Sequence, residues 1–148
     1  MGMRRQAREW ALQLLFQDDF NREDPSTAYE EFWAARDADP RIRKFTEDIV
    51  AGVHAQLQIL DDKIQEYAEH WNIKRMGGVE RNAIRMALFE MLFCPEIPPV
   101  VSIDEAVEIT KLYSSNESGK FVNGILDRAL RDIKRPSRNA GRSTSTKE

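Results

Sequence analysis

The chain has 148 residues, of which 41% are hydrophobic and 32% are charged, and its formal net charge is −3. This composition excludes a disordered chain and is typical of a single globular domain with one hydrophobic core. No apolar run approaches the roughly 20 residues of a transmembrane helix, and the N-terminus does not resemble a signal peptide. A single cysteine, Cys94, cannot form an internal disulfide. We therefore expect a cytoplasmic protein without a membrane anchor.

The charge is distributed unevenly along the chain. Residues 1–9 sum to +2, because three arginines oppose one glutamate, and residues 128–148 sum to +5, because seven Lys or Arg oppose two acids. The remaining residues therefore carry −10. A nucleic acid would meet the protein at its basic ends, since phosphate binding needs local rather than total positive charge. The alternative, that basic ends only aid solubility, is not excluded by charge alone.

Helical periodicity dominates the first half of the chain. A buried stripe with helical spacing predicts a first helix: Ala7, Ala11, Leu14 and Leu15. Two Asp-Pro pairs, at residues 24–25 and 39–40, each place an N-capping acid before a proline suited to the first helical position, and each predicts a helix start. The second periodic run persists to Trp71, which is too long for one uncapped helix, so we expect a break near residues 56–60.

The second half contains a central helix between two non-helical segments. Residues 74–78, with two glycines, indicate a loop, and Val79–Phe93 is apolar on most faces, as is typical of a helix in the middle of a core. The prolines Pro95, Pro98 and Pro99 end this helix, and we expect them to impose an extended connector.

Two further helices complete the predicted fold. Ser102 and Glu105 form a capping box that opens one of them, and the last begins near Ser118, with Gly124 allowing another helix to approach closely. Residues 136–148 are predicted to be a disordered basic tail. The sequence thus predicts an all-α fold, a compact bundle of six to seven helices in one domain over residues 1–135.

No arrangement of residues suited to catalysis is found. The two histidines and Cys94 lack the spacing of a zinc site, and neither glycine-rich phosphate loop motif occurs. His54 is best explained as a partly buried, hydrogen-bonded side chain. Neighbouring acids such as Asp61 and Asp62 point about 100° apart on a helix, as on a solvated surface. We expect no enzymatic activity, no cofactor and no metal.

The first helix carries a candidate surface for single-stranded nucleic acid. Arg5, Leu12 and Phe16 lie within about 40° of one another, with Arg8 on the adjoining row, well round from the buried stripe. Arginine holds phosphates, and an aromatic ring offers a face on which a base stacks. The alternative is that Phe16 packs against a neighbouring helix or loop.

The start of the last helix is a second candidate surface. The amides after Ser118 and Gly119 would form a helix N-terminus that favours an anion, and Lys120 adds a positive charge. The alternatives are that Phe121 is a core residue and that Asn123 satisfies a backbone group in a loop.

Four segments occur in the order expected of the NusB family: RRQAREWALQLLF, VERNAIRMALFEML, IPPVVSIDEAVEITKLYS and SGKFVNGIL. The chain resembles this family over residues 4–134. The resemblance implies two packed helical subdomains, no catalysis, and a role in transcription antitermination. Members bind the boxA element of ribosomal RNA leader transcripts together with the ribosomal protein NusE, and then join NusA, NusG and RNA polymerase.

The resemblance also implies which residues bind. RNA-binding positions map onto Arg4, Arg5, Arg8, Phe16, Tyr113, Glu117, Ser118, Lys120 and Phe121. NusE-binding positions map onto Tyr67, Glu80, Arg81 and Arg85.

Three departures from the family pattern limit this mapping: Gln6 interrupts the arginine run, Glu80 replaces the usual aspartate, and residues 136–148 extend past the family core. Two alternatives stay open. One is a homodimer-forming helical interaction protein, since some members self-associate. The other is a stand-alone relative of the RNA-binding domain of ribosomal RNA methyltransferases. An enzyme of that kind would need a much longer chain.

Overall fold

The computed structural model describes residues 2–20 and 24–134, in which every regular element is helical. The α-helices are α1 (Met3–Asp18), α2 (Tyr29–Ala34), α3 (Pro40–Ala55), α4 (Leu57–Tyr67), α5 (Gly78–Phe93), α6 (Pro99–Tyr113) and α7 (Asn116–Lys134), and two short 3-10 helices are η1 (Pro25–Ala28) and η2 (Ile73–Arg75). The all-α prediction is confirmed. The tail predicted for residues 136–148 lies outside the described residues. Within the described ranges, no helix is long and apolar enough to span a membrane.

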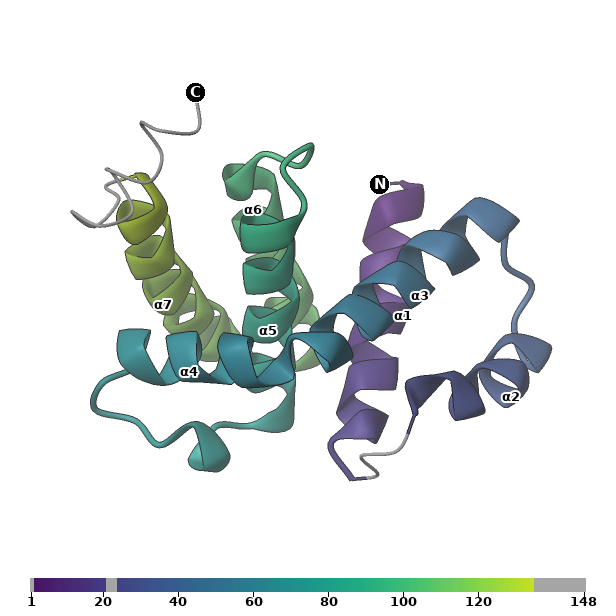
Figure 1. Ribbon diagram of the computed structural model, residues 1–148, viewed down its shortest axis with the longest axis horizontal. Coiled ribbons are helices and arrows are strands. Elements are labelled where there is room, and N and C mark those ends of the chain that lie inside the picture. Colours follow the sequence, from purple (N-terminus) through teal and green to yellow (C-terminus); the bar gives the residue numbers. More distant parts are fainter. Residues whose placement is uncertain (1, 21–23, 135–148) are drawn as a thin grey trace.

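The helices form two packed groups, α1–α3 and α4–α7 (Figure 1). Helix α5 joins them, because it contacts α1, α3, α4, α6 and α7. Its residues Ala83, Ile84 and Leu88 are fully buried, as expected of a central helix. Burying one such Ile or Leu side chain contributes roughly 1.5–3 kcal/mol. The two groups therefore share one hydrophobic core.

The predicted helix starts and the predicted break are confirmed. The Asp24 carboxylate accepts a hydrogen bond from the Ser26 amide (3.0 Å), and Asp39 accepts one from the Arg41 amide (2.8 Å), each with a proline in the first turn. These side chains satisfy amides that a helix start leaves without a partner. The break between α3 and α4 falls at Gln56, within the expected range.

Two predictions for the segment after α5 are wrong. Pro99 is the first residue of α6 rather than part of an extended connector, since the first turn of a helix does not need the missing proline N–H. The helix therefore starts three residues before Ser102, and no capping box forms. The Ser102 hydroxyl instead donates to Glu90 (2.6 Å), and Glu105 forms an ion pair with α1.

The start of α7 also differs from the expectation. The helix begins two residues earlier, because the Ser115 hydroxyl caps it by accepting a hydrogen bond from the Ser118 amide (3.1 Å). Gly124 does not admit a neighbouring helix, since a Cβ added there would meet nothing within 4 Å. The close approach occurs at Gly119, where a Cβ would lie 2.8 Å from the side chain of Lys111.

Candidate nucleic-acid interface

The three N-terminal arginines occupy three different environments on α1. Arg4 is exposed, and its guanidinium lies 4.7 Å from the ring centroid of Phe45. Arg5 is half-buried and makes a two-pronged ion pair with Glu105, at 2.5 and 2.9 Å. The Arg8 side chain is only 4% exposed. Arg4 is therefore the arginine of this group whose charge is most accessible to a phosphate.

Arg8 is held inside the protein by a matched carboxylate. Its Nε and Nη2 atoms donate to the two oxygens of Glu90 at 2.8 and 2.9 Å, and Ser102 donates to the same carboxylate. Leu12, one turn further along, is also buried. Arg8 and Leu12 therefore do not lie on an open side of α1 as expected, because α5 packs against α1 there, whereas Arg5 stays partly exposed.

Phe16 lies at the edge of the core and is 40% exposed. It packs edge-on against the exposed Phe20, with ring centroids 5.6 Å apart. It also lies directly on the backbone at the start of α5, where a Cβ added to Gly78 would approach the Phe16 ring to 2.5 Å. The prediction that Phe16 lies off the buried stripe of α1 is confirmed. The alternative, that Phe16 packs against a neighbouring helix, is confirmed as well. One side of the ring is packed and the other is accessible.

Tyr113, at the end of α6, contacts α1 close to Phe16 in the sequence of that helix. Its hydroxyl accepts a hydrogen bond from Gln13 (3.0 Å) and donates one to Glu9 (3.2 Å), while its ring is partly exposed. Burial and the carboxylate of Glu9 raise the pKa of the phenol, so the hydroxyl stays protonated at neutral pH. The ring is therefore fixed at the α1–α6 seam with part of its surface free.

The loop between α6 and α7 is tied to the start of α5. Ser114 and Ser118 both donate hydrogen bonds to the carboxylate of Glu80. Glu117 and Lys120 are exposed beside them. These contacts bring the predicted RNA-binding residue Ser118 next to Glu80, which the family resemblance assigns to partner binding.

The anion site expected at the start of α7 is not present in the predicted form. The amide of Ser118 is bonded to the Ser115 hydroxyl, and the amide of Gly119 is bonded to the Ser115 carbonyl, so neither is available to an anion. Lys120 provides the accessible positive charge here. Phe121 is half-buried and contacts Trp71 edge-on, with ring centroids 5.6 Å apart.

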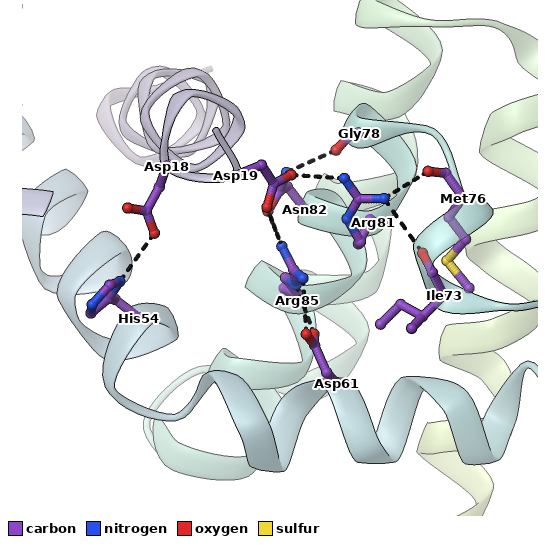
Figure 2. A network of polar contacts seen from close by, with 10 residues as sticks. All are labelled: Asp18, Asp19, His54, Asp61, Ile73, Met76, Gly78, Arg81, Asn82 and Arg85. Carbon is purple, nitrogen blue, oxygen red and sulfur yellow. Dashed lines mark hydrogen bonds and ion pairs between the residues drawn. The ribbon is translucent and has the colours of Figure 1, made fainter. Parts of the chain in front are cut away.

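The predicted partner-binding arginines belong to a polar network between α1, α4 and α5 (Figure 2). Arg85, whose side chain is 4% exposed, donates to Asp61 through two nitrogens (2.8 and 2.9 Å) and to Asp19 through the third (2.8 Å). Arg81 donates to Asp19 (2.9 Å) and to the carbonyl of Met76 (2.7 Å). The network fastens the end of α1 and the side of α4 to the central helix.

The other two predicted partner-binding residues differ in accessibility. Tyr67 is buried, and its hydroxyl donates to Asp132 (2.6 Å); burial and this carboxylate raise the pKa of the phenol. Glu80 is only half-buried. Of the four positions, the structure therefore leaves Glu80 and Arg81 partly accessible and buries Tyr67 and Arg85.

We expect the stability of the fold to decrease in acid because of Asp19 and Glu105. Burial tends to raise the pKa of Asp19, but hydrogen bonds from Arg85, Asn82 and Arg81 outweigh it and leave the pKa below its ordinary value. The hydrogen bond from Arg5 lowers the pKa of Glu105. A carboxyl with a lowered native pKa stabilises the fold above its unfolded pKa, about 4, and this stabilisation is lost as pH falls through the native pKa.

Urea unfolding between pH 7 and pH 3 checks this expectation. The free energy of unfolding should be level from pH 7 to about 5 and should fall at lower pH. The variant Asp19→Asn should start lower at pH 7 and depend less on pH. An acid dependence identical to that of the parent would contradict the role given to Asp19.

His54 matches its prediction, since its Nδ1 lies 3.0 Å from the Asp18 carboxylate and its ring is partly buried. In residues 2–20 and 24–134, no group of three or more His, Cys, Asp or Glu side chains is placed to hold a metal ion. Sequence reasoning missed the partners Glu90, Glu105 and Asp19. These carboxylates lie 62–100 residues from their arginines, and no local pattern signals such a pairing.

The described residues form an all-helical fold with accessible aromatic and basic side chains on α1 and at the α6–α7 junction. A sequence model of the NusB family matches residues 5–131. The chain belongs to the NusB family.

Relatives and solved structures are similar over most of their lengths. Transcription antitermination protein NusB of Desulfosudis oleivorans is 41% identical over 136 residues, covering 90% of this chain and 88% of that protein. The T. maritima NusB structure is 40% identical with a TM-score of 0.79, covering 87% of this chain and 91% of that one. A structure of the antitermination factors NusB and NusE in complex with dsRNA is 27% identical with a TM-score of 0.77, covering 85% and 94%.

Proposed function

We propose that the protein is a non-catalytic transcription antitermination factor that binds boxA RNA of ribosomal RNA leader transcripts together with NusE. Family membership supports the role, and the similar structure of NusB with NusE and RNA supports the two partners. The observation that carries the proposal is the surface that forms where Phe16 packs on the start of α5, Tyr113 bonds to α1 and Ser118 bonds to Glu80, with the exposed Lys120 two residues further along α7. We call this surface the α1–α6–α7 face.

The predicted RNA-binding residues, on this face and elsewhere along α1, have distinct proposed roles. Arg4, Arg5 and Lys120 bind phosphates, and Phe16, Tyr113 and Phe121 offer ring surface to bases. Glu117 and Ser118 add polar contacts at the α6–α7 junction. Arg8 acts through position rather than contact, because its buried pair with Glu90 holds α1 against α5.

We propose that NusE binds around Glu80 and Arg81, the partly accessible members of the predicted partner site. Tyr67 and Arg85 would support this surface from beneath through Asp132 and Asp61. With RNA and NusE bound, the protein would join NusA, NusG and RNA polymerase in the cytoplasm. Glu80 would lie where the two surfaces meet, since it is hydrogen-bonded to Ser118.

Fluorescence anisotropy tests the proposal directly. Labelled boxA RNA and a scrambled RNA of equal length are titrated with the protein, with and without NusE, at several salt concentrations. We expect preference for boxA that sharpens when NusE is present. Equal weak binding to both RNAs, unchanged by NusE, would contradict the proposed function.

A double variant, Arg4→Ala with Lys120→Ala, tests the phosphate contacts. Two lost contacts with a single-stranded RNA should weaken binding and reduce the slope of log affinity against log salt by about 1.4, because fewer counterions are released. The matched control is Arg41→Ala with Arg131→Ala, which removes the same charge from exposed positions on α3 and the far end of α7. Equal salt slopes for the two double variants would refute the assignment.

A further inference from the structure

An open groove lies between the loop that follows α4 and the outer side of α7. Its lining includes His70 and Trp71 from the loop and Lys120, Phe121, Gly124 and Arg128 from α7. Tyr67, which the family resemblance assigns to partner binding, also lines this groove, whereas the resemblance assigns no role to Trp71 or Arg128. Lys120 and Phe121 also belong to the proposed RNA surface, so the groove continues that surface across α7.

Trp71 is the side chain that distinguishes the groove. It is 57% exposed, whereas Trp33 is 4% exposed and Trp10 is half-buried in the core. Its ring contacts Phe121 edge-on, at an interplanar angle of 77°, so one edge is supported while much of its surface stays open to solvent. An exposed indole is costly to hydrate and is a good stacking platform for a nucleobase.

The loop holds Trp71 in a defined position. The Trp71 amide donates to the carbonyl of Ala68 (2.8 Å), and the Gln65 side chain donates to the Trp71 carbonyl (2.6 Å). The same Gln65 side chain accepts a hydrogen bond from the amide of Ile73 (3.0 Å). Because the backbone on both sides is fixed, little additional order is required when a ligand stacks on the ring.

Positive charge lies beside this ring. Lys120 is exposed and makes no hydrogen bond or ion pair with the residues that the structure describes. Arg128 donates to the carbonyl of Tyr67 and lies 3.6 Å from Glu69, which leaves part of its guanidinium exposed. Gly124, between these two positions on α7, has open space where a side chain would be. The groove thus combines an aromatic platform, unobstructed backbone and cations.

We propose that this groove binds an unpaired nucleotide of the same single-stranded RNA, with its base stacked on Trp71 and its phosphate near Lys120 and Arg128. The inference rests on the proposed function, because it extends the path of the RNA from the α1–α6–α7 face over Phe121. The occupant is RNA rather than an apolar peptide, since Lys120 and Arg128 border the accessible ring and outnumber Glu69, the one carboxylate of the lining.

Tryptophan fluorescence and RNA affinity test the proposal together. The probes are a boxA RNA and versions lengthened by four nucleotides at the 5′ or the 3′ end. We expect one lengthened RNA to quench the emission of the parent protein and to leave that of Trp71→Phe largely unchanged. Trp71→Ala should weaken binding of that RNA about 5- to 150-fold, the range for losing one stacked base, and Trp71→Phe should weaken it less.

The control variant is Ile59→Ala, which removes another exposed apolar side chain, from α4, outside the groove. Equal urea midpoints for the parent, Trp71→Ala and Ile59→Ala would establish that folding is unaffected. If every RNA binds Trp71→Ala as tightly as the parent, the groove proposal is overturned while the proposed function stands.

Two other outcomes also overturn the groove proposal. Loss of NusE binding in Trp71→Ala with RNA affinity unchanged would assign the groove to a protein partner instead. Absence of RNA binding by the parent protein, with and without NusE, would overturn the proposed function and this inference together.

Discussion

Replacement of Arg8 by alanine should lower the free energy of unfolding by about 3–5 kcal/mol, the cost of breaking a buried ion pair from one side. The carboxylate of Glu90 would stay buried with only the hydroxyl of Ser102 as a described partner. Urea unfolding followed by circular dichroism measures the loss. A decrease below about 1 kcal/mol would contradict the buried pairing.

Arg4→Ala is the matched control, because it removes the same side chain from an exposed position one turn earlier. We expect it to change stability by no more than about 0.5 kcal/mol. The double variant Arg8→Met with Glu90→Leu should recover much of the loss, since well-packed apolar residues often replace a buried pair without cost. Measuring Arg4→Ala and Arg8→Ala separately also distinguishes an effect on folding from an effect on RNA binding. A variant that replaces Arg4, Arg5 and Arg8 together would combine the two effects.

Replacement of Arg85 by alanine should destabilise the protein by a similar amount, about 3–5 kcal/mol. The substitution removes the donor that joins Asp19 at the end of α1 to Asp61 on α4 (Figure 2). Both carboxylates would lose hydrogen bonds from a cation. Amide hydrogen exchange should accelerate in α4 and at the end of α1 more than in α7.

Arg85→Lys provides the graded comparison. A lysine keeps the charge but cannot present a planar fork to both carboxylates, so we expect an intermediate loss of stability. Loss of NusE binding by Arg85→Ala under conditions where the variant is folded and exchanges like the parent would show that Arg85 contacts the partner directly. If the loss of NusE binding is instead proportional to the fraction of unfolded protein, Arg85 supports the binding surface without contacting NusE.

The sequence predicts most helices because their signals are local. The stripe that begins at Ala7, the caps at Asp24 and Asp39, and the apolar segment Val79–Phe93 all follow from spacing within one or two turns. The prediction is wrong at Ser102, where a local pattern typical of a cap was available but a buried carboxylate on α5 formed the stronger contact.

The candidate site is less predictable than the fold. Periodicity locates Phe16 off the buried stripe, but it cannot show that Arg8 turns inward, since Glu90 is 82 residues away. The exposure of Trp71 is equally invisible, because a tryptophan at the end of a helical pattern is typical of a core residue. Accessibility depends on which helix covers which face, and this is a property of the whole fold.

The α1–α6–α7 face combines α1 with α7, which lie at opposite ends of the described chain. Arg5 is paired with a residue 100 positions later, and Lys120 lies further still along the chain. Because a ribosome releases the N-terminal end first, α1 emerges long before its carboxylate partners. We expect Arg5 and Arg8 to be solvated until α5 and α6 have left the ribosome. The RNA surface would then be assembled only when α7 docks, so nascent chains that end before this helix would lack it.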